Sequence, residues 1–156
     1  MTKLLRLLAL TMLGGLLPTT VGLAQGVTTE ILENAQNYSD RWVTYGRNYG
    51  AWRYMPDDQI NRETVANLRP VWIKQTGVTG GAFEVTALVN DGRMYLTTAN
   101  SHLIVVDPLS GTELWRYDHE FENVDLCCGP HNRGVALYED KVFWGTLDAH
   151  LLAFDA

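Results

Sequence analysis

The chain has 156 residues, among them five tryptophans, seven tyrosines and fourteen glycines, and its formal net charge at pH 7 is −6. This composition favours strands and turns over helices. The acidic balance, with no basic patch beyond the N-terminus, argues against nucleic acid as a partner.

Residues 1–24 have the pattern of a secretory signal peptide. Two basic residues precede an almost wholly apolar run over residues 7–17, and Gly22 and Ala24 supply the small residues of a cleavage site. Cleavage there places the mature chain in the oxidising bacterial periplasm. The alternative is a retained anchor, although the run is too short for a good spanning helix. No later stretch is apolar enough to cross a membrane, so we expect no transmembrane anchor.

Residues 25–70 form a lead-in segment. The Thr-Thr-Glu stretch at 28–30 can cap a short helix that reaches about Asn34. A further helical turn is expected to begin at Asn61 and to end before Pro70. Between them, aromatic residues alternate with turn formers.

From Val71 onward the pattern changes to short strands separated by turns. Turns are expected at residues 90–92 (Asn-Asp-Gly) and 108–111 (Pro-Leu-Ser-Gly), which have suitable turn chemistry. The first set of expected strands covers residues 71–76, 83–89, 93–98, 103–107 and 113–117, and the second covers 134–138, 141–146 and 150–155.

The two sets of strands are related as an internal repeat. Residues 93–107 align without a gap over residues 141–155, and most paired positions are apolar. His102 and His150 occupy equivalent positions, which indicates structural roles for both. A period in the forties with four strands a unit is typical of a β-propeller blade, although two unrelated hairpins are the alternative. The sequence therefore predicts an all-β propeller fold over residues 71–156.

The repeat also predicts that the propeller is incomplete. Residues 71–118 make about one blade, and residues 133–156 make three strands of the next. Propellers typically close with about 4–8 blades. We therefore expect this chain to be a fragment that contains only about two blades.

The only two cysteines, Cys127 and Cys128, are adjacent within the stretch DLCCGPHNRG at 125–134. Adjacent Cα atoms lie about 3.8 Å apart across a trans peptide, closer than the roughly 4.4–6.8 Å of an ordinary disulfide. A bond between them would be strained, and backbone strain concentrates at functional sites. Two buried thiols, or bonds to another chain, remain as alternatives.

These stretches together resemble the PQQ-dependent (quinoprotein) alcohol dehydrogenases of the methanol and ethanol dehydrogenase family, where PQQ is pyrroloquinoline quinone. Residues 105–115, VVDPLSGTELW, resemble the tryptophan-docking repeat of these eight-bladed propellers, in which a tryptophan of one blade stacks on a peptide of its neighbour. The loop CCGPHNRG resembles the family's adjacent-cysteine loop. The resemblance covers essentially all of residues 38–156.

The resemblance implies four cofactor-binding residues. Cys127 and Cys128 would form a vicinal disulfide that packs flat against PQQ. Arg133 would approach the quinone carbonyls, where a guanidinium stabilises negative charge as hydride arrives. Glu84 would contact the cofactor, with Thr86 near it. The alternatives are a surface or blade-joining salt bridge for Arg133 and a strand-edge charge for Glu84.

Two positions depart from the family pattern. The cysteines are followed by Gly129-Pro130-His131, where the family often has aspartate directly after the second cysteine, and Ala87 stands where the family tends to have proline. The first departure could change the conformation of the loop beside the cofactor, but it does not change which cofactor the resemblance implies. His131 has no second metal ligand at a sensible spacing, which favours a solvated loop histidine over an acid, a base or a metal ligand.

For function, the resemblance implies a periplasmic enzyme that oxidises primary alcohols by hydride transfer to PQQ and passes electrons to a cytochrome c or a quinone. It implies a calcium or lanthanide ion whose ligands, like the catalytic carboxylate, lie beyond Ala156. The chain alone is therefore expected to hold no catalytic residue and to be inactive.

The rival class is a non-catalytic periplasmic propeller, such as a scaffold of outer-membrane assembly. A scaffold of that type should carry a lipidation cysteine after the signal and lack a cysteine pair beside Asn-Arg-Gly. This sequence has the reverse pattern.

Overall fold

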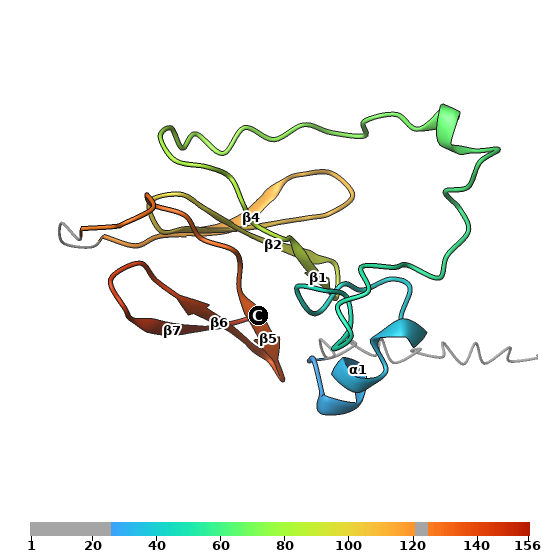
Figure 1. The fold of residues 1–156 in the computed structure, drawn as a ribbon, viewed down its shortest axis with the longest axis horizontal. Coiled ribbons are helices and arrows are strands. Elements are labelled where there is room, and N and C mark those ends of the chain that lie inside the picture. The colour runs from blue at the N-terminus through green and yellow to red at the C-terminus, as the bar shows by residue number, and fades with distance from the viewer. Residues whose placement is uncertain (1–25, 121–124) are drawn as a thin grey trace, which may run out of the picture.

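Two antiparallel sheets follow one another along the chain (Figure 1). The computed structural model describes residues 26–120 and 125–156, so the predicted signal peptide lies outside it. The first sheet has the order β1-β2-β3-β4 and the second the order β5-β6-β7. The strands are β1 Leu88–Asn90, β2 Arg93–Thr98, β3 His102–Val106, β4 Glu113–Asp118, β5 Ala136–Tyr138, β6 Lys141–Gly145 and β7 Leu151–Asp155. Each sheet is an up-and-down meander, as in a propeller blade. The predicted all-β fold, with one blade and part of a second, is confirmed.

Tight turns connect the strands where the sequence predicts them. The β1–β2 hairpin turns at Asp91 and Gly92, whose φ values of 47° and 69° are both positive, as a two-residue primed turn requires. Beyond β3, the Asp107 carboxylate accepts hydrogen bonds from the backbone N–H groups of Leu109 and Ser110 at 2.8 and 2.9 Å. These bonds hold the pKa of Asp107 below its usual value. Local turn chemistry therefore supports the β1–β2 and β3–β4 connections.

The predicted strand over residues 71–76 is wrong, because it pairs with no other strand among the described residues. The stretch is nevertheless extended, with Trp72 half-buried and its neighbours Val71 and Ile73 about 85% exposed. Side-chain contacts hold this stretch beside β4. Lys74 forms an ion pair with Glu113 at 3.0 Å, and Arg116 donates to the Thr76 carbonyl at 3.2 Å. Residues 71–76 are therefore an extended segment that is not hydrogen-bonded into either of the described sheets.

Two other predicted strands are shorter than expected at their N-terminal ends. The strand predicted at 83–89 begins only at Leu88, and the one predicted at 134–138 begins at Ala136. The residues before each strand contact the other loop instead, since the Thr86 N–H donates to the Arg133 carbonyl at 3.4 Å. The backbone hydrogen bond therefore joins the two loops instead of extending either strand.

Trp72 makes a tryptophan-docking contact on the repeat at residues 105–115, although the resemblance was drawn from that repeat's own tryptophan, Trp115. Its indole N–H donates to the Pro108 carbonyl at 2.9 Å, and the ring lies over the Gly111 backbone. A Cβ at Gly111 would lie 2.6 Å from the indole, and the φ of this glycine is +70°. Glycine is therefore required here by both space and backbone conformation.

The lead-in segment contacts both sheets and completes the core. Helix α1 (Thr29–Glu33) is capped by Thr28, as predicted, and short 3-10 helices follow at Ala35–Asn37 and Val65–Asn67. Val27 pairs with Glu139 of the β5–β6 turn, and Trp42 pairs with Val89 of β1. The buried core they enclose consists of Val27, Ile31, Ala35, Val43, Leu88, Tyr95, Leu103, Val105, Leu137, Val142 and Trp144.

A buried arginine holds the lead-in together. Arg47 is 1% exposed, and its guanidinium donates to the carbonyls of Ala35 at 2.6 Å and Tyr38 at 3.0 Å. Both carbonyls also accept a backbone N–H, from Tyr38 at 3.2 Å and from Arg41 at 3.4 Å, so the guanidinium adds a second bond to each and ties the 3-10 turn to the segment that follows. Across the described ranges 26–120 and 125–156, no helix combines the length and apolar character needed to cross a membrane.

Candidate functional site

The loop before β1 and the loop before β5 lie against each other. The Ala82 N–H donates to His131 Nδ1 at 3.3 Å, and a Cβ at Gly81 would lie 3.1 Å from the Pro130 ring. These contacts join the cysteine loop to the segment that precedes β1. Both loops lead into the first strand of a sheet, β1 and β5 respectively.

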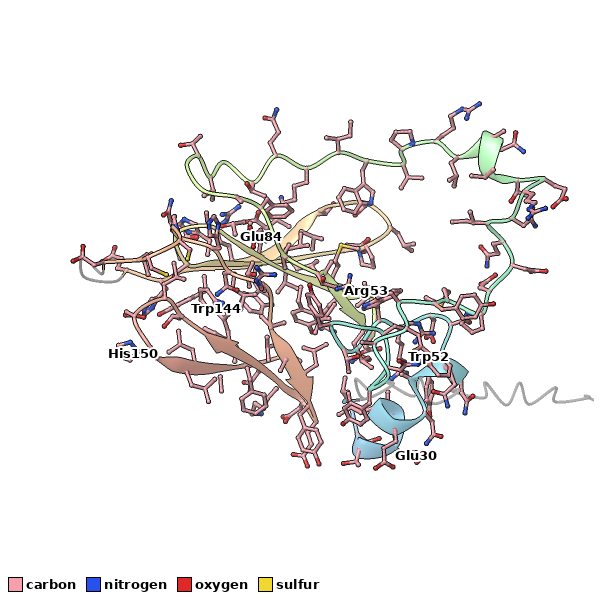
Figure 2. All side chains as sticks on the ribbon, viewed as in Figure 1. Glu30, Trp52, Arg53, Glu84, Trp144 and His150 are labelled. Carbon is pink, nitrogen blue, oxygen red and sulfur yellow. The ribbon has the colours of Figure 1, made fainter. Side chains whose placement is uncertain are left out.

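Glu84 and Arg133 lie together at this place (Figure 2 labels Glu84). The family resemblance implied each of them individually as a cofactor-binding residue. Arg133 Nη2 lies 3.0 Å from Glu84 Oε2, and the side chains are 70% and 33% exposed. The pair joins the two blades, as the salt-bridge alternative for Arg133 predicted. It also leaves most of the Arg133 side chain exposed. Glu84 Oε2 is buried and, within the described residues, accepts no hydrogen bond of good geometry despite this close approach.

Asn132 holds Arg133 in position, a role that the sequence reasoning did not assign. Asn132 is 8% exposed; its Nδ2 donates to the Gly145 carbonyl at 2.9 Å, and its Oδ1 accepts from the Gly134 N–H at 3.1 Å. Gly134 has a φ of +126°, which side chains disfavour. The Asn-Arg-Gly triplet therefore anchors the loop to the end of β6 and turns Arg133 outward. The Asn-Arg-Gly triplet was the sequence feature from which the role of Asn132 could have been predicted.

Tyr45 is a second residue that the sequence reasoning did not single out. The Arg53 guanidinium lies 4.5 Å from the centre of its ring and holds the pKa of the Tyr45 phenol below its usual value, with smaller contributions from Thr86 and Arg133. The lead-in therefore brings a phenol and a second cation to the Glu84–Arg133 pair. No local spacing could reveal this, because the residues are far apart in the sequence.

Cys127 and Cys128 are both exposed, and their sulfur atoms lie 2.9 Å apart as two thiols. The hydrogen bond between them raises the pKa of the Cys128 thiol. The sulfur atoms are in contact but farther apart than the roughly 2.05 Å of a disulfide bond. The vicinal disulfide stays a prediction.

We expect the exported protein to carry the Cys127–Cys128 bond, because disulfides form and persist in an oxidising compartment and the two sulfur atoms already lie in contact. Mass spectrometry of the unreduced tryptic peptide 117–133 should find it two hydrogens lighter than the same peptide after reduction. The reduced digest is the control. Complete alkylation of both cysteines without reductant would contradict the bond.

His131 differs from the solvated loop histidine that the sequence predicts. It is half-buried, and its Nδ1 accepts the hydrogen bond from Ala82 that joins the two loops. Gly129, with a φ of +93°, brings the backbone close to its ring. His131 therefore has a structural role in the cysteine loop.

The fold and this site combine propeller-type sheets with a cysteine loop and a Glu84–Arg133 pair on the loops before β1 and β5. The family model described as "Glucose/ethanol/alcohol dehydrogenase, beta-propeller domain" matches residues 42–156. The chain therefore belongs to the PQQ-dependent alcohol dehydrogenase family.

Curated relatives and solved structures agree with this assignment. The dehydrogenase subunit of the quinone alcohol dehydrogenase from Komagataeibacter europaeus is 43% identical over 135 residues, which are 85% of this chain and 18% of that protein. Quinohemoprotein alcohol dehydrogenase from Comamonas testosteroni superposes with a TM-score of 0.73 at 34% identity, over 81% of this chain and 19% of that one. A europium-containing methanol dehydrogenase superposes with a TM-score of 0.68 at 29% identity, over 81% of this chain and 23% of that one. The chain spans about a fifth of the length of these proteins.

Proposed function

We propose that this chain is the N-terminal part of a periplasmic PQQ-dependent enzyme that oxidises primary alcohols. The observation that carries the proposal is the meeting of Glu84 and Arg133 beside the adjacent-cysteine loop, in a chain of this family. When bound, PQQ accepts a hydride from the alcohol and releases the electrons singly to a cytochrome c or a quinone, with a calcium or lanthanide ion as Lewis acid.

The residues of the site fit a planar, negatively charged quinone. Arg133 presents a largely exposed guanidinium, whose planar set of donors suits carbonyl and carboxylate oxygens. Glu84 supplies a carboxylate that is one-third exposed and pairs with Arg133 through its buried Oε2. Cys127 and Cys128 present exposed sulfur atoms on the same loop as Arg133. This set combines a cation, an acceptor and a polarizable surface for a ring.

In the proposed reaction, Arg133 would hold the quinone by donating hydrogen bonds to an oxygen on which negative charge can develop. Glu84 holds the guanidinium from the neighbouring loop, and Asn132 fixes the backbone that carries it. Donors fixed in advance stabilise developing charge without reorganising, which is the main source of electrostatic catalysis. We assign no residue of this chain to the quinone-linked metal or to the proton abstraction.

The periplasmic location rests on the signal-like N-terminus, and the choice of alcohol rests on the relatives, which are named as alcohol and methanol dehydrogenases. The scaffold alternative is not favoured, because the chain carries the adjacent cysteines followed by Asn-Arg-Gly. An acidic chain also suits a basic electron acceptor, although its charge serves solubility as well.

The test is an assay of the full-length gene product, purified without cofactor and then given PQQ with calcium or a lanthanide. We expect ethanol-dependent reduction of a dye acceptor that requires PQQ, with little activity on glucose. The same protein without PQQ is the control. A protein that oxidises no primary alcohol with either metal, or oxidises glucose instead, would overturn the proposed substrate class.

A further inference from the structure

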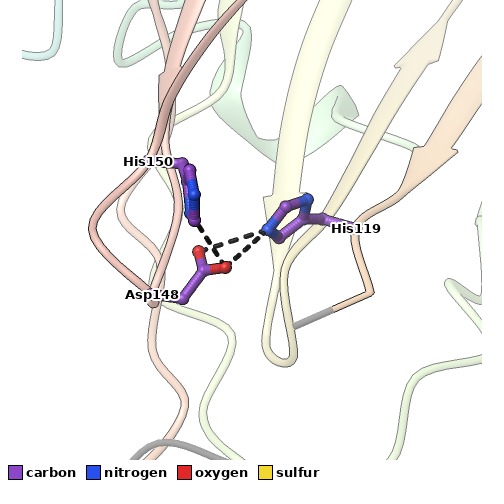
Figure 3. A group of neighbouring side chains, drawn as sticks. All are labelled: His119, Asp148 and His150. Atoms are coloured by element: carbon purple, nitrogen blue, oxygen red, sulfur yellow. Dashed lines mark hydrogen bonds and ion pairs between the residues drawn. The ribbon is translucent and has the colours of Figure 1, made fainter. Parts of the chain in front are cut away.

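Three side chains with metal-binding groups meet between the two sheets, apart from the site described above (Figure 3). His119 follows the last residue of β4, while Asp148 and His150 belong to the β6–β7 turn. His119 Nε2 lies 3.0 Å from Asp148 Oδ2, and His150 Nδ1 lies 3.0 Å from the same oxygen. The three potential ligand atoms all lie within 4.8 Å of one another.

We propose that His119, Asp148 and His150 bind a zinc ion that links the first blade to the second. This inference does not rest on the proposed dehydrogenase activity. It concerns a structural site in the same chain, formed by residues that take no part in the cofactor site.

The donor set suits zinc. Two imidazole nitrogens and a carboxylate oxygen are common zinc ligands, at about 2.0–2.2 Å from the ion. Tetrahedral geometry at those lengths places ligand atoms about 3.3 Å apart, so the present separations require only small side-chain movements. A water molecule can complete the fourth position. Calcium and lanthanides prefer oxygen ligands, which sets this site apart from the one implied for the quinone-linked ion.

Two of the three ligands are already held in place. The side chains of His119 and Asp148 are 12% and 13% exposed, whereas that of His150 is 64% exposed. The His119 ring packs edge-on against Trp144 with centroids 6.3 Å apart. His150 is therefore the ligand that can move to close around an ion.

A supporting contact orients the carboxylate. The Thr146 hydroxyl donates to Asp148 Oδ1, and the same hydroxyl accepts the His150 N–H at 3.2 Å. These contacts leave Oδ2 directed at both imidazoles. Hydrogen bonds of this kind fix the orientation of metal ligands, and their loss commonly lowers metal affinity by about 10–100-fold.

The equivalent turn in the first blade provides an internal comparison. His102 aligns with His150 in the repeat, but Asn100 stands where the second blade has Asp148. His102 contacts a carboxylate of Asp118 at 2.8 Å instead. Within residues 26–120 and 125–156, the group of His119, Asp148 and His150 is the one that combines three potential ligands. The metal-binding arrangement is thus specific to the junction of the two blades.

The experiment uses tag-free, full-length protein saturated with calcium, so that the quinone-linked site does not take up zinc. Zinc is titrated against a chromophoric chelator, and the melting temperature is followed in parallel. We expect one equivalent of zinc to bind and to raise the melting temperature, because an ion that binds the folded state alone stabilises it. His150→Gln and Asp148→Asn should each weaken zinc binding by at least about tenfold.

His102→Gln is the matched control and should leave zinc affinity unchanged. The two ligand variants are expected to fold, because His150 is exposed and Asp148→Asn copies the residue found in the first blade. Their zinc-free melting temperatures test this directly. Wild-type protein that binds no zinc, or wild-type affinity in both ligand variants, would overturn the site.

Discussion

Arg133→Lys should lower the turnover of the full-length enzyme by about 10–100-fold at saturating PQQ. Lysine keeps the positive charge but replaces the rigid planar fork by a single ammonium nitrogen, so its donors cannot reproduce the fixed spacing with which Arg133 addresses Glu84 and a quinone oxygen. Removing one fixed donor from a site of developing negative charge typically lowers the rate by about 10²–10³-fold, and the retained charge moderates that loss. The measurement is steady-state alcohol oxidation with a dye acceptor.

Arg93→Lys is the matched control for this prediction. Arg93 also pairs with a carboxylate, Asp91, at 3.7 Å, but it lies at the β1–β2 hairpin rather than beside the cysteine loop. The Arg93 variant should keep normal turnover. The melting temperature of both variants separates a local effect from unfolding. Unchanged kinetics for Arg133→Lys would remove this residue from the cofactor site.

Gly111→Ala should destabilise the docking of Trp72 on the first blade by about 2–5 kcal/mol. An alanine there must hold the left-handed conformation, which costs about 1–2 kcal/mol, and its Cβ would lie 2.6 Å from the indole. Overpacking of that kind typically costs a further 1–3 kcal/mol or so. The measurement is the shift in the denaturation midpoint of the full-length protein.

Gly92→Ala separates the conformational cost of the alanine from its steric clash with Trp72. Gly92 has a φ of +69°, close to that of Gly111, but no described atom lies within 4 Å of the position that a Cβ would take there. We therefore expect Gly92→Ala to show the conformational effect alone. In a Trp72→Ala background, Gly111→Ala should cost no more than Gly92→Ala, because the steric partner is gone. Equal effects of the two glycine variants in the wild-type background would contradict the docking interpretation.

Local sequence patterns determined the strands, the turns and the repeat of this protein. Strands β2, β3 and β4 lie within a residue of their predicted bounds, because Asp91-Gly92 and the Asp107 turn are encoded by neighbouring residues. The helix that follows Thr28 was predictable for the same reason, since its cap is a contact between residues three apart. The adjacent cysteines and Asn-Arg-Gly were sufficient to suggest the family.

Tertiary structure alone decided which distant groups meet. Residues 71–76 have a strand's sequence, yet a strand exists only where a second backbone supplies hydrogen bonds, and the described residues supply none there. Tyr45 reaches Arg133 through the lead-in, and His119 reaches Asp148 and His150 across a blade junction. The sequence encodes each of these side chains, but their separations along the chain carry no periodic signal. Only the packing of the lead-in and of the two sheets brings these side chains together.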